Sequence, residues 1–332
     1  MTTLTSRIDE GVFVDIHGVP QWLALRGDDR ANPALMIVTG PGFGFAALAP
    51  FFASFERSFT LVQWDQPGAG FTFGKNGDAG DLTIERLVSD GLRVAELACE
   101  RLGAPRLALL CVSGGTIVGL QMVQRRPELF SAYVGTGQFV DWRRQDADSY
   151  ALLLTRARAL GDAAMLAELE ALGPPPYADA ESDARKSKYA GAPTAREGAA
   201  FAELLPLVAA ASAGQPPSAK YLAHGVPWPE PRPRSFAAYI ALRDDLLAFD
   251  ARKLSPRFAV PMFFVQGADD LYSVAAEVQR YAEEIEAPHV EVVTIDGAGH
   301  SVMFLRAEFL AALERHVRRA LNPAYALNPA YL

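Results

Sequence analysis

One stretch of the chain, residues 106–126, constrains the fold more than any other. It begins with an apolar run over residues 106–112 whose length suits a buried strand of a parallel sheet. Ser113 and two glycines follow, and the residues up to Arg126 are compatible with a helix. Ser113 is therefore predicted to lie at a corner where a strand turns into a helix.

The residues around Ser113 are similar to the G-x-S-x-G pattern of a nucleophile elbow, in which a tight turn exposes a serine hydroxyl beside the free amides of the next helix. Gly115 occupies the second glycine position, whereas Cys111 replaces the first. Both positions must be small so that strand and helix can approach, and cysteine is the next size up from glycine and alanine. Two other interpretations stay open on this stretch alone: a serine that only caps the helix, and Cys111 itself as the nucleophile.

The composition is that of an ordinary soluble globular protein. Of 332 residues, 50% are hydrophobic and 21% are charged, which suits one large domain that carries an insertion. The formal net charge of -8 and the lack of a basic cluster predict neither a nucleic-acid nor a membrane partner. Residues 1–11 contain no apolar leader, so we expect a cytoplasmic location. The two cysteines, Cys99 and Cys111, predict no disulfide framework and no metal site.

Strands and helices alternate on both sides of a long helical stretch. Alternating hydrophobicity over residues 11–26 predicts a hairpin. Further strands are expected at 33–38, 59–64, 106–112, 131–137, 260–266 and 290–295, and core helices at 83–102, 275–285 and 307–320. This order predicts an α/β fold with a mostly parallel, doubly wound sheet.

The helical stretch from about residue 141 to residue 234 is rich in alanine and leucine and contains proline-rich segments at 173–176 and 227–233. We interpret it as a helical cap domain inserted into the sheet domain. The predicted boundaries are 1–139 and 236–320 for the two parts of the core, 140–235 for the cap and 321–332 for a tail.

Polar residues follow the last two strands, at the edge where parallel sheets place their chemistry. Asp269 and Asp270 follow the second-last strand, and His300 follows the last. A serine hydroxyl becomes a good nucleophile when an imidazole takes its proton, and a carboxylate holds that imidazole in the right tautomer. We therefore predict Ser113, Asp270 and His300 as a catalytic triad, with Asp270 preferred to Asp269.

A loop with three glycines, residues 39–44, follows the strand at 33–38 and exposes backbone amides. Acyl transfer needs two amide donors aimed at the developing oxyanion. Gly114 is predicted to supply one and Gly40 the other, with Gly42 as the alternative. The loop could also be a simple connection, and its spacing is not that of a phosphate-binding P-loop.

Together these motifs resemble the proline iminopeptidase branch of the α/β-hydrolases. The resemblance rests on the elbow at Ser113, the Gly40-Pro41-Gly42 turn, the Asp-Gln-Pro-Gly-Ala-Gly segment at 65–70, residues 126–138, and residues 267–270 with Gly299-His300. It covers residues 33–318 and is weak across the insertion. It implies an α/β-hydrolase fold with a helical cap, and a cytoplasmic serine hydrolase without a cofactor that acts on small peptides, amides or esters.

The chain departs from that branch at several positions. Residues 38–39 are Val-Thr where the family has His-Gly, and Pro67 replaces an arginine. Cap carboxylates of the family hold the α-amino group of the substrate, but the tryptophan-and-glutamate motif of that cap is not recognisable. Glu203, Asp244 or Asp245 could take this role or could be solvated surface acids.

The function that we expect is that of a serine hydrolase of the prolyl aminopeptidase type, with a small molecule or short peptide as its substrate. A carboxylesterase of small acyl esters is the alternative. Because a fold does not imply a function, a non-catalytic ligand-binding protein is the alternative of another class.

Overall fold

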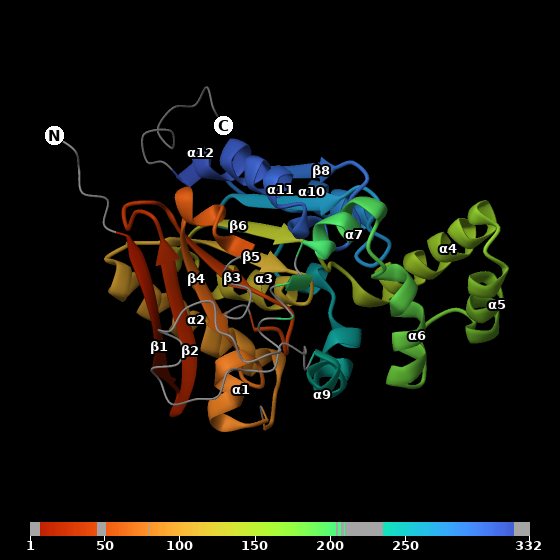
Figure 1. The fold of residues 1–332 in the computed structure, drawn as a ribbon, viewed down its shortest axis with the longest axis horizontal. Coiled ribbons are helices and arrows are strands. Elements are labelled where there is room, and N and C mark those ends of the chain that lie inside the picture. The colour runs from red at the N-terminus through yellow and green to blue at the C-terminus, as the bar shows by residue number, and fades with distance from the viewer. Residues whose placement is uncertain are drawn as a thin grey trace.

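The computed structural model of the protein describes residues 7–44, 51–78, 80–203, 205, 206, 209 and 235–321. Within this part of the chain, an eight-stranded sheet crosses the molecule with helices on both faces, and a group of further helices projects from one end (Figure 1). The predicted tail beyond Leu321 and the proline-rich segment at 227–233 lie outside the described residues.

The sheet has the strand order β1-β2-β4-β3-β5-β6-β7-β8. Pairings from β4 through β8 are parallel, whereas β1 and β2 form an antiparallel edge. The strands are β1 (Ile8–Ile16), β2 (Val19–Gly27), β3 (Ala34–Val38), β4 (Thr60–Asp65), β5 (Leu107–Val112), β6 (Phe130–Thr136), β7 (Met262–Gly267) and β8 (Val290–Ile295). The predicted fold class is confirmed, including the hairpin and every predicted strand.

Strand β3 is apolar throughout because helices cover both faces of the sheet. Met36 and Val38 pack on one side with α2 (Ile84–Leu102) and α3 (Gly115–Arg125). Leu35 and Ile37 pack on the other side with α11 (Arg306–Ala312). A strand buried on both faces has a continuous apolar run, which is the pattern seen in the sequence.

The chain order of the strands reverses at β3, which has β4 on one side and β5 on the other. Open α/β sheets bind ligands in the crevice beyond the carboxyl ends of strands at such a reversal. The glycine loop after β3 and Ser113 after β5 therefore meet at the position where a ligand site is expected.

Two core helices differ from the prediction. Helix α1 (Gly70–Asn76) lies in a segment for which no helix was expected. The helix predicted at 307–320 consists of α11, a π-helical segment at Leu313–Val317 and α12 (Arg318–Leu321). Helix α10 (Ala275–Glu284) lies where it was expected.

Between β6 and β7, the described residues form helices and contain no strand. The helices are α4 (Trp142–Leu160), α5 (Ala163–Leu172), α6 (Ala180–Ala190), α7 (Ala195–Ala202) and α9 (Ser235–Ala248). Helices α4, α5 and α6 extend away from the sheet, whereas α7 lies close to the core near α11 (Figure 1). We refer to these five helices as the cap. No helix in the described part of the chain is long and apolar enough to cross a membrane.

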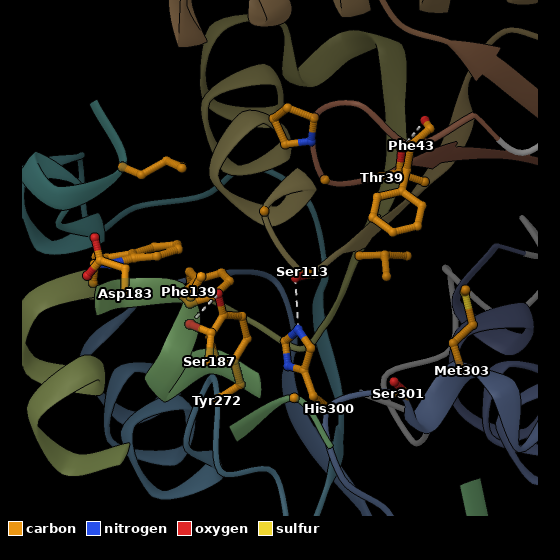
Figure 2. Close-up of a pocket in the computed structure, with 18 of the residues that line it drawn as sticks. Thr39, Phe43, Ser113, Phe139, Asp183, Ser187, Tyr272, His300, Ser301 and Met303 are labelled. Atoms are coloured by element: carbon orange, nitrogen blue, oxygen red, sulfur yellow. Dashed lines mark hydrogen bonds between the residues drawn. The ribbon is translucent and has the colours of Figure 1, made fainter. Parts of the chain in front are cut away.

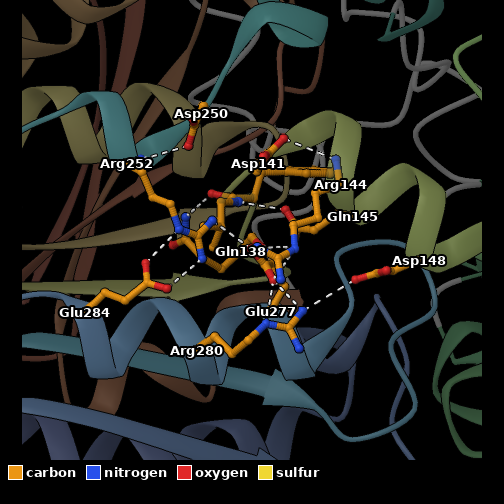
Figure 3. Close-up of polar contacts among 12 residues, drawn as sticks. Gln138, Asp141, Arg144, Gln145, Asp148, Asp250, Arg252, Glu277, Arg280 and Glu284 are labelled. Carbon is orange, nitrogen blue, oxygen red and sulfur yellow. Dashed lines mark hydrogen bonds and ion pairs between the residues drawn. The ribbon is translucent and has the colours of Figure 1, made fainter.

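A buried glutamate attaches the cap to the core (Figure 3). Glu277 of α10 is fully buried, and its carboxylate pairs with Arg280 of the same helix. It also pairs with Arg252 at 2.7 Å and with Arg144 of α4 at 3.3 Å. A buried carboxylate is costly unless it is paired and hydrogen-bonded, so this cluster fixes α4 against α10.

Candidate active site

Ser113 lies in the tight turn between β5 and α3. Its φ of +54° is a left-handed conformation that residues with side chains rarely adopt. The turn brings α3 so close to the loop after β3 that a Cβ on Gly115 would lie 2.3 Å from the Val38 carbonyl oxygen. Gly115 is therefore required for the close approach of helix and loop at the elbow.

Cys111 packs against α3 from the strand side. Its side chain is fully buried, and a Cβ on Gly119 would lie 2.0 Å from its Sγ atom. Burial raises the pKa of the Cys111 thiol well above its ordinary value. A buried, protonated thiol is a poor nucleophile, which argues against Cys111 as the reactive group.

Ser113, His300 and Asp270 are joined by a chain of hydrogen bonds. Ser113 Oγ lies 2.8 Å from His300 Nε2, a hydrogen bond drawn as a dashed line in Figure 2, and His300 Nδ1 lies 3.0 Å from Asp270 Oδ2. The three residues come from the loops after β5, β8 and β7. This is the geometry that a serine nucleophile, a general base and an orienting acid require.

The Asp270 carboxylate is held in place by its own loop. It accepts hydrogen bonds from the Tyr272 amide at 2.7 Å and the Ser273 amide at 2.9 Å, and from the Ser273 hydroxyl. Burial acts to raise the pKa of Asp270, but the charge of His300 and the hydrogen bonds from His300 and Ser273 outweigh it, so the pKa lies below its ordinary value. Asp269 is exposed, and Asp270 is the one that contacts His300.

A cap side chain contacts residues 268–274, the loop after β7 that carries Asp270 and that we call the acid loop. Gln145 of α4 is fully buried, and its Nε2 donates to the Ser273 carbonyl at 2.7 Å and to the Gln138 carbonyl at 3.0 Å. Its Oε1 accepts from the Val140 amide at 2.7 Å. Gln145 thus joins the acid loop to the loop after β6, beside the cluster around Glu277 (Figure 3).

Gly40 and Gly114, predicted as oxyanion donors, lie next to each other. A Cβ on Gly40 would be 3.6 Å from the Gly114 amide nitrogen, and both glycines line the cavity beside Ser113. Neither amide donates to an acceptor in the part of the chain that the structure describes. Gly42, the alternative to Gly40, has a φ of +81° and is not among the residues that line the cavity.

The loop that carries Gly40 is fixed by two side chains. The buried Gln66 donates from Nε2 to the Thr39 carbonyl at 2.9 Å. Thr39 Oγ1 donates to the Phe43 carbonyl at 3.0 Å, which closes the turn on itself. The Gly40 amide is therefore held by the surrounding structure before any substrate binds.

A cavity of about 520 Å³ opens over Ser113 and His300 (Figure 2). Figure 2 shows Phe139, Tyr272 and Asp183 on one side of the Ser113–His300 pair, with Phe43 and Met303 on the other. Apolar and aromatic side chains from the core and the cap make most of its wall: Phe43, Val112, Phe139, Trp142, Leu246, Tyr272, Met303 and Phe304.

The aromatic side of the cavity also supports the histidine. The Tyr272 and His300 rings form a T-shaped pair with a centroid distance of 4.8 Å, and Phe139 stacks on Trp142 at 4.4 Å. Pairs at such distances are attractive beyond their buried area. The imidazole of His300 thus packs against the Tyr272 ring on the side of the cavity away from Phe43.

Among the described residues that line the cavity, Asp183 of α6 is the one with a carboxylate. It is 5% exposed, and its Oδ2 accepts from Arg243 Nε of α9 at 2.7 Å. Arg243 also donates to the Tyr177 carbonyl at 2.6 Å. The hydrogen bonds within the described residues leave Asp183 Oδ1 without a donor.

The acids that the sequence suggested for a cap site lie elsewhere. Glu203 is 64% exposed and pairs with Arg306. Asp244 is exposed, and Asp245 accepts a hydrogen bond from the Ile84 amide at 3.4 Å. None of the three lines the cavity, whereas Asp183 does.

The fold and the site are those of an α/β hydrolase, and the chain belongs to this family: the family model described as "alpha/beta hydrolase fold" matches residues 16–307. The chain is 25% identical over 320 residues to the probable aminopeptidase YbaC of Bacillus subtilis (strain 168), a match that covers 93% of this chain and 96% of that protein.

Two solved structures share the fold along nearly the whole chain. The proline iminopeptidase-related protein of Thermus thermophilus superposes with a TM-score of 0.62 at 19% identity, covering 96% of this chain and 99% of the other. The proline iminopeptidase of Mycobacterium smegmatis gives 0.56 at 16% identity, covering 95% and 99%. At these identities the likeness establishes the fold and leaves the substrate open.

Proposed function

We propose that the protein is a serine hydrolase that cleaves small peptide, amide or ester substrates through an acyl-enzyme. The observation that carries this proposal is the hydrogen-bond chain from Ser113 through His300 to Asp270 beside a cavity. With Nδ1–H donating to Asp270, the Nε2 atom of His300 is free to take the Ser113 proton as Oγ attacks the substrate carbonyl. Asp270 then stabilises the imidazolium that forms.

The later steps use the same groups. The tetrahedral oxygen would accept hydrogen bonds from the Gly40 and Gly114 amides. His300 returns its proton to the leaving amine or alcohol, which departs and leaves the acyl group on Ser113. A water molecule that loses its proton to His300 then releases the acid and restores the serine hydroxyl. The scheme requires no cofactor.

For the substrate class we propose a compound with a free α-amino group, as in a prolyl aminopeptidase. Asp183 supports this choice, because its Oδ1 atom can accept a charge-assisted hydrogen bond from an ammonium group inside a largely apolar cavity. The names of the relatives, a probable aminopeptidase and a proline iminopeptidase, point to the same class.

A carboxylesterase of small acyl esters is the second candidate. It is favoured by the pairing of Asp183 with Arg243, which offsets the negative charge that an ammonium group would seek. The remaining wall of the cavity is mainly apolar and suits an uncharged acyl chain.

Two experiments test the proposal. A fluorophosphonate should modify Ser113 stoichiometrically in the wild-type protein and leave Ser113→Ala unmodified, as measured by mass spectrometry. No labelling would support a non-catalytic ligand-binding protein instead. Turnover of proline p-nitroanilide would support the aminopeptidase, whereas turnover of p-nitrophenyl acetate and butyrate alone would leave the carboxylesterase.

The proposal includes a small molecule or short peptide as the binding partner, and neither nucleic acid nor membrane. The formal net charge of -8 supports this view. The two free cysteines, Cys99 and Cys111, are compatible with a cytoplasmic location.

A further inference from the structure

The first turn of cap helix α7 contacts residues 296–301, the loop after β8 that carries His300 and that we call the histidine loop. Glu197 of α7 accepts a hydrogen bond from the Gly299 amide through Oε1 at 2.9 Å. Its Oε2 accepts from the Thr194 amide at 2.8 Å, and Thr194 Oγ1 accepts from the Glu197 amide at 3.3 Å. Glu197 therefore closes a capping box at the start of α7 and reaches at the same time to the residue before His300.

The Glu197 carboxylate needs its hydrogen bonds because the side chain is buried. The Glu197 side chain is fully buried, and within the described residues no lysine or arginine pairs with it. A buried carboxylate of this kind is tolerated when hydrogen bonds satisfy it. Its two oxygens accept from two backbone amides, that of Thr194 at the N-cap of its own helix and that of Gly299 before His300.

The start of α7 packs closely against the histidine loop because Gly299 has no side chain. A Cβ on Gly299 would lie 2.9 Å from Glu197 Oε2 and 3.2 Å from Thr194 Cγ2, so a side chain there would displace the carboxylate. Arg196, the neighbour of Glu197, donates to the Asp296 carbonyl at the start of the same loop. From the core side, the Asp269 amide donates to the Ala298 carbonyl at 2.8 Å. The loop is thus held between the acid loop and the cap.

We propose that Glu197 is a positioning residue for His300. It fixes the Gly299 backbone from the cap side and thereby keeps His300 Nε2 within hydrogen-bond distance of Ser113. Glu197 is not among the residues that line the cavity, so its effect passes through His300 and not through contact with substrate. This role rests on the proposed function, in which His300 is the base.

The test compares Glu197→Ala and Glu197→Gln with Glu170→Gln, an exposed cap acid of α5 that pairs with Arg158. A small displacement of a catalytic group costs up to about 100-fold in rate, so Glu197→Ala should slow both fluorophosphonate labelling of Ser113 and kcat by about 10- to 100-fold. KM should change little. The labelling rate and kcat of Glu197→Gln should lie between those of wild type and Glu197→Ala. The glutamine amide has one oxygen, so it can accept from one of the two N–H groups but not both. Glu170→Gln should behave as wild type.

A double mutant separates positioning from a general loss of structure. In a His300→Ala background, Glu197→Ala should cause no further loss of labelling rate, whereas the same fractional loss in both backgrounds would overturn the proposal. Hydrogen exchange of the Gly299 amide should be faster in Glu197→Ala than in wild type. If Glu197→Ala does not fold, Glu197→Gln carries the same comparisons.

The failure of this inference differs from the failure of the proposed function. An unreactive Ser113 in the wild-type protein would overturn the proposed function, and the role of Glu197 with it. A reactive wild type together with Glu197 variants of unchanged labelling rate and kcat would overturn the role of Glu197 alone.

Discussion

The sulfur atom of Cys111 occupies the space that a side chain on Gly119 would need. A Cβ at Gly119 would lie only 2.0 Å from Sγ, so strand β5 and helix α3 fit together because one side chain is present and the other absent. The cysteine at the first small position of the elbow is therefore compensated by a glycine about one turn into the helix. The dependence of one position on the other can be tested with single and double variants.

Gly119→Ala should destabilise the protein by about 1 to 3 kcal/mol, the usual cost of overpacking a core. Adding Cys111→Ala should recover most of that loss, because the smaller side chain makes room for the new methyl group. Urea unfolding of the two single variants and the double variant measures the coupling. Losses that simply add would show that the two positions do not share the space.

Asp183→Asn keeps the shape of the side chain and removes its charge. If Asp183 binds the α-amino group, kcat/KM for proline p-nitroanilide should fall about 10- to 100-fold, as expected for a lost charged hydrogen bond. Hydrolysis of p-nitrophenyl butyrate should change little. The matched control is Asp244→Asn, an exposed acid that does not line the cavity. Equal effects of Asp183→Asn on both substrates would contradict the amino-group assignment.

Glu277→Gln should destabilise the protein by roughly 3 kcal/mol, the lower end for a broken buried ion pair, because the three arginines around it are partly exposed. Glu284, which also pairs with Arg252, is 46% exposed, so Glu284→Gln should cost less than about 1 kcal/mol. Chemical unfolding of both variants makes the comparison. A similar cost for both would mean that Glu277 does not hold the cap to the core.

Asp270 makes stability depend on pH. Its pKa is lower in the folded protein than its ordinary value of 3.8, so folding favours the ionised form. The resulting stability is complete well above that value and is lost as the pH falls through the lower folded pKa. The difference in unfolding free energy between wild type and Asp270→Asn should therefore be constant near neutral pH and shrink below about pH 4. A difference that stays constant in strong acid would contradict the lowered pKa.

The sequence was sufficient to place the strands and to bring Ser113, Asp270 and His300 to one edge of the sheet. Buried parallel strands have continuous apolar runs, and the loops after them carry the polar residues. Helix α1 was missed because glycines at 70 and 74 disfavour a helix. Tertiary contacts stabilise it instead: Asp65 Oδ2 accepts from the Phe71 amide at 2.9 Å, and Thr72 Oγ1 donates to the Asp65 carbonyl at 2.5 Å.

The roles of Asp183 and Glu197 in the cap could not be predicted from the sequence, for a different reason. Helix α6 is mostly polar, and an acid in such a helix normally faces solvent. Asp183 can be buried because Arg243 from α9, which is distant in the sequence, pairs with it. The Thr194-x-x-Glu197 capping box has a sequence pattern. The contact of Glu197 with Gly299 joins residues 102 positions apart, and no local pattern predicts it.

Helix α7 bonds to the histidine loop and α4 bonds to the acid loop, so the insertion and the reactive centre are built as one unit. A chimera that carried the insertion of another family member on this sheet domain would lose these supports along with the old cavity wall. On the proposed function, substrate choice and catalysis therefore depend on the same insertion, and a change of specificity made through the cap must preserve the two side chains that contact these loops, Gln145 and Glu197.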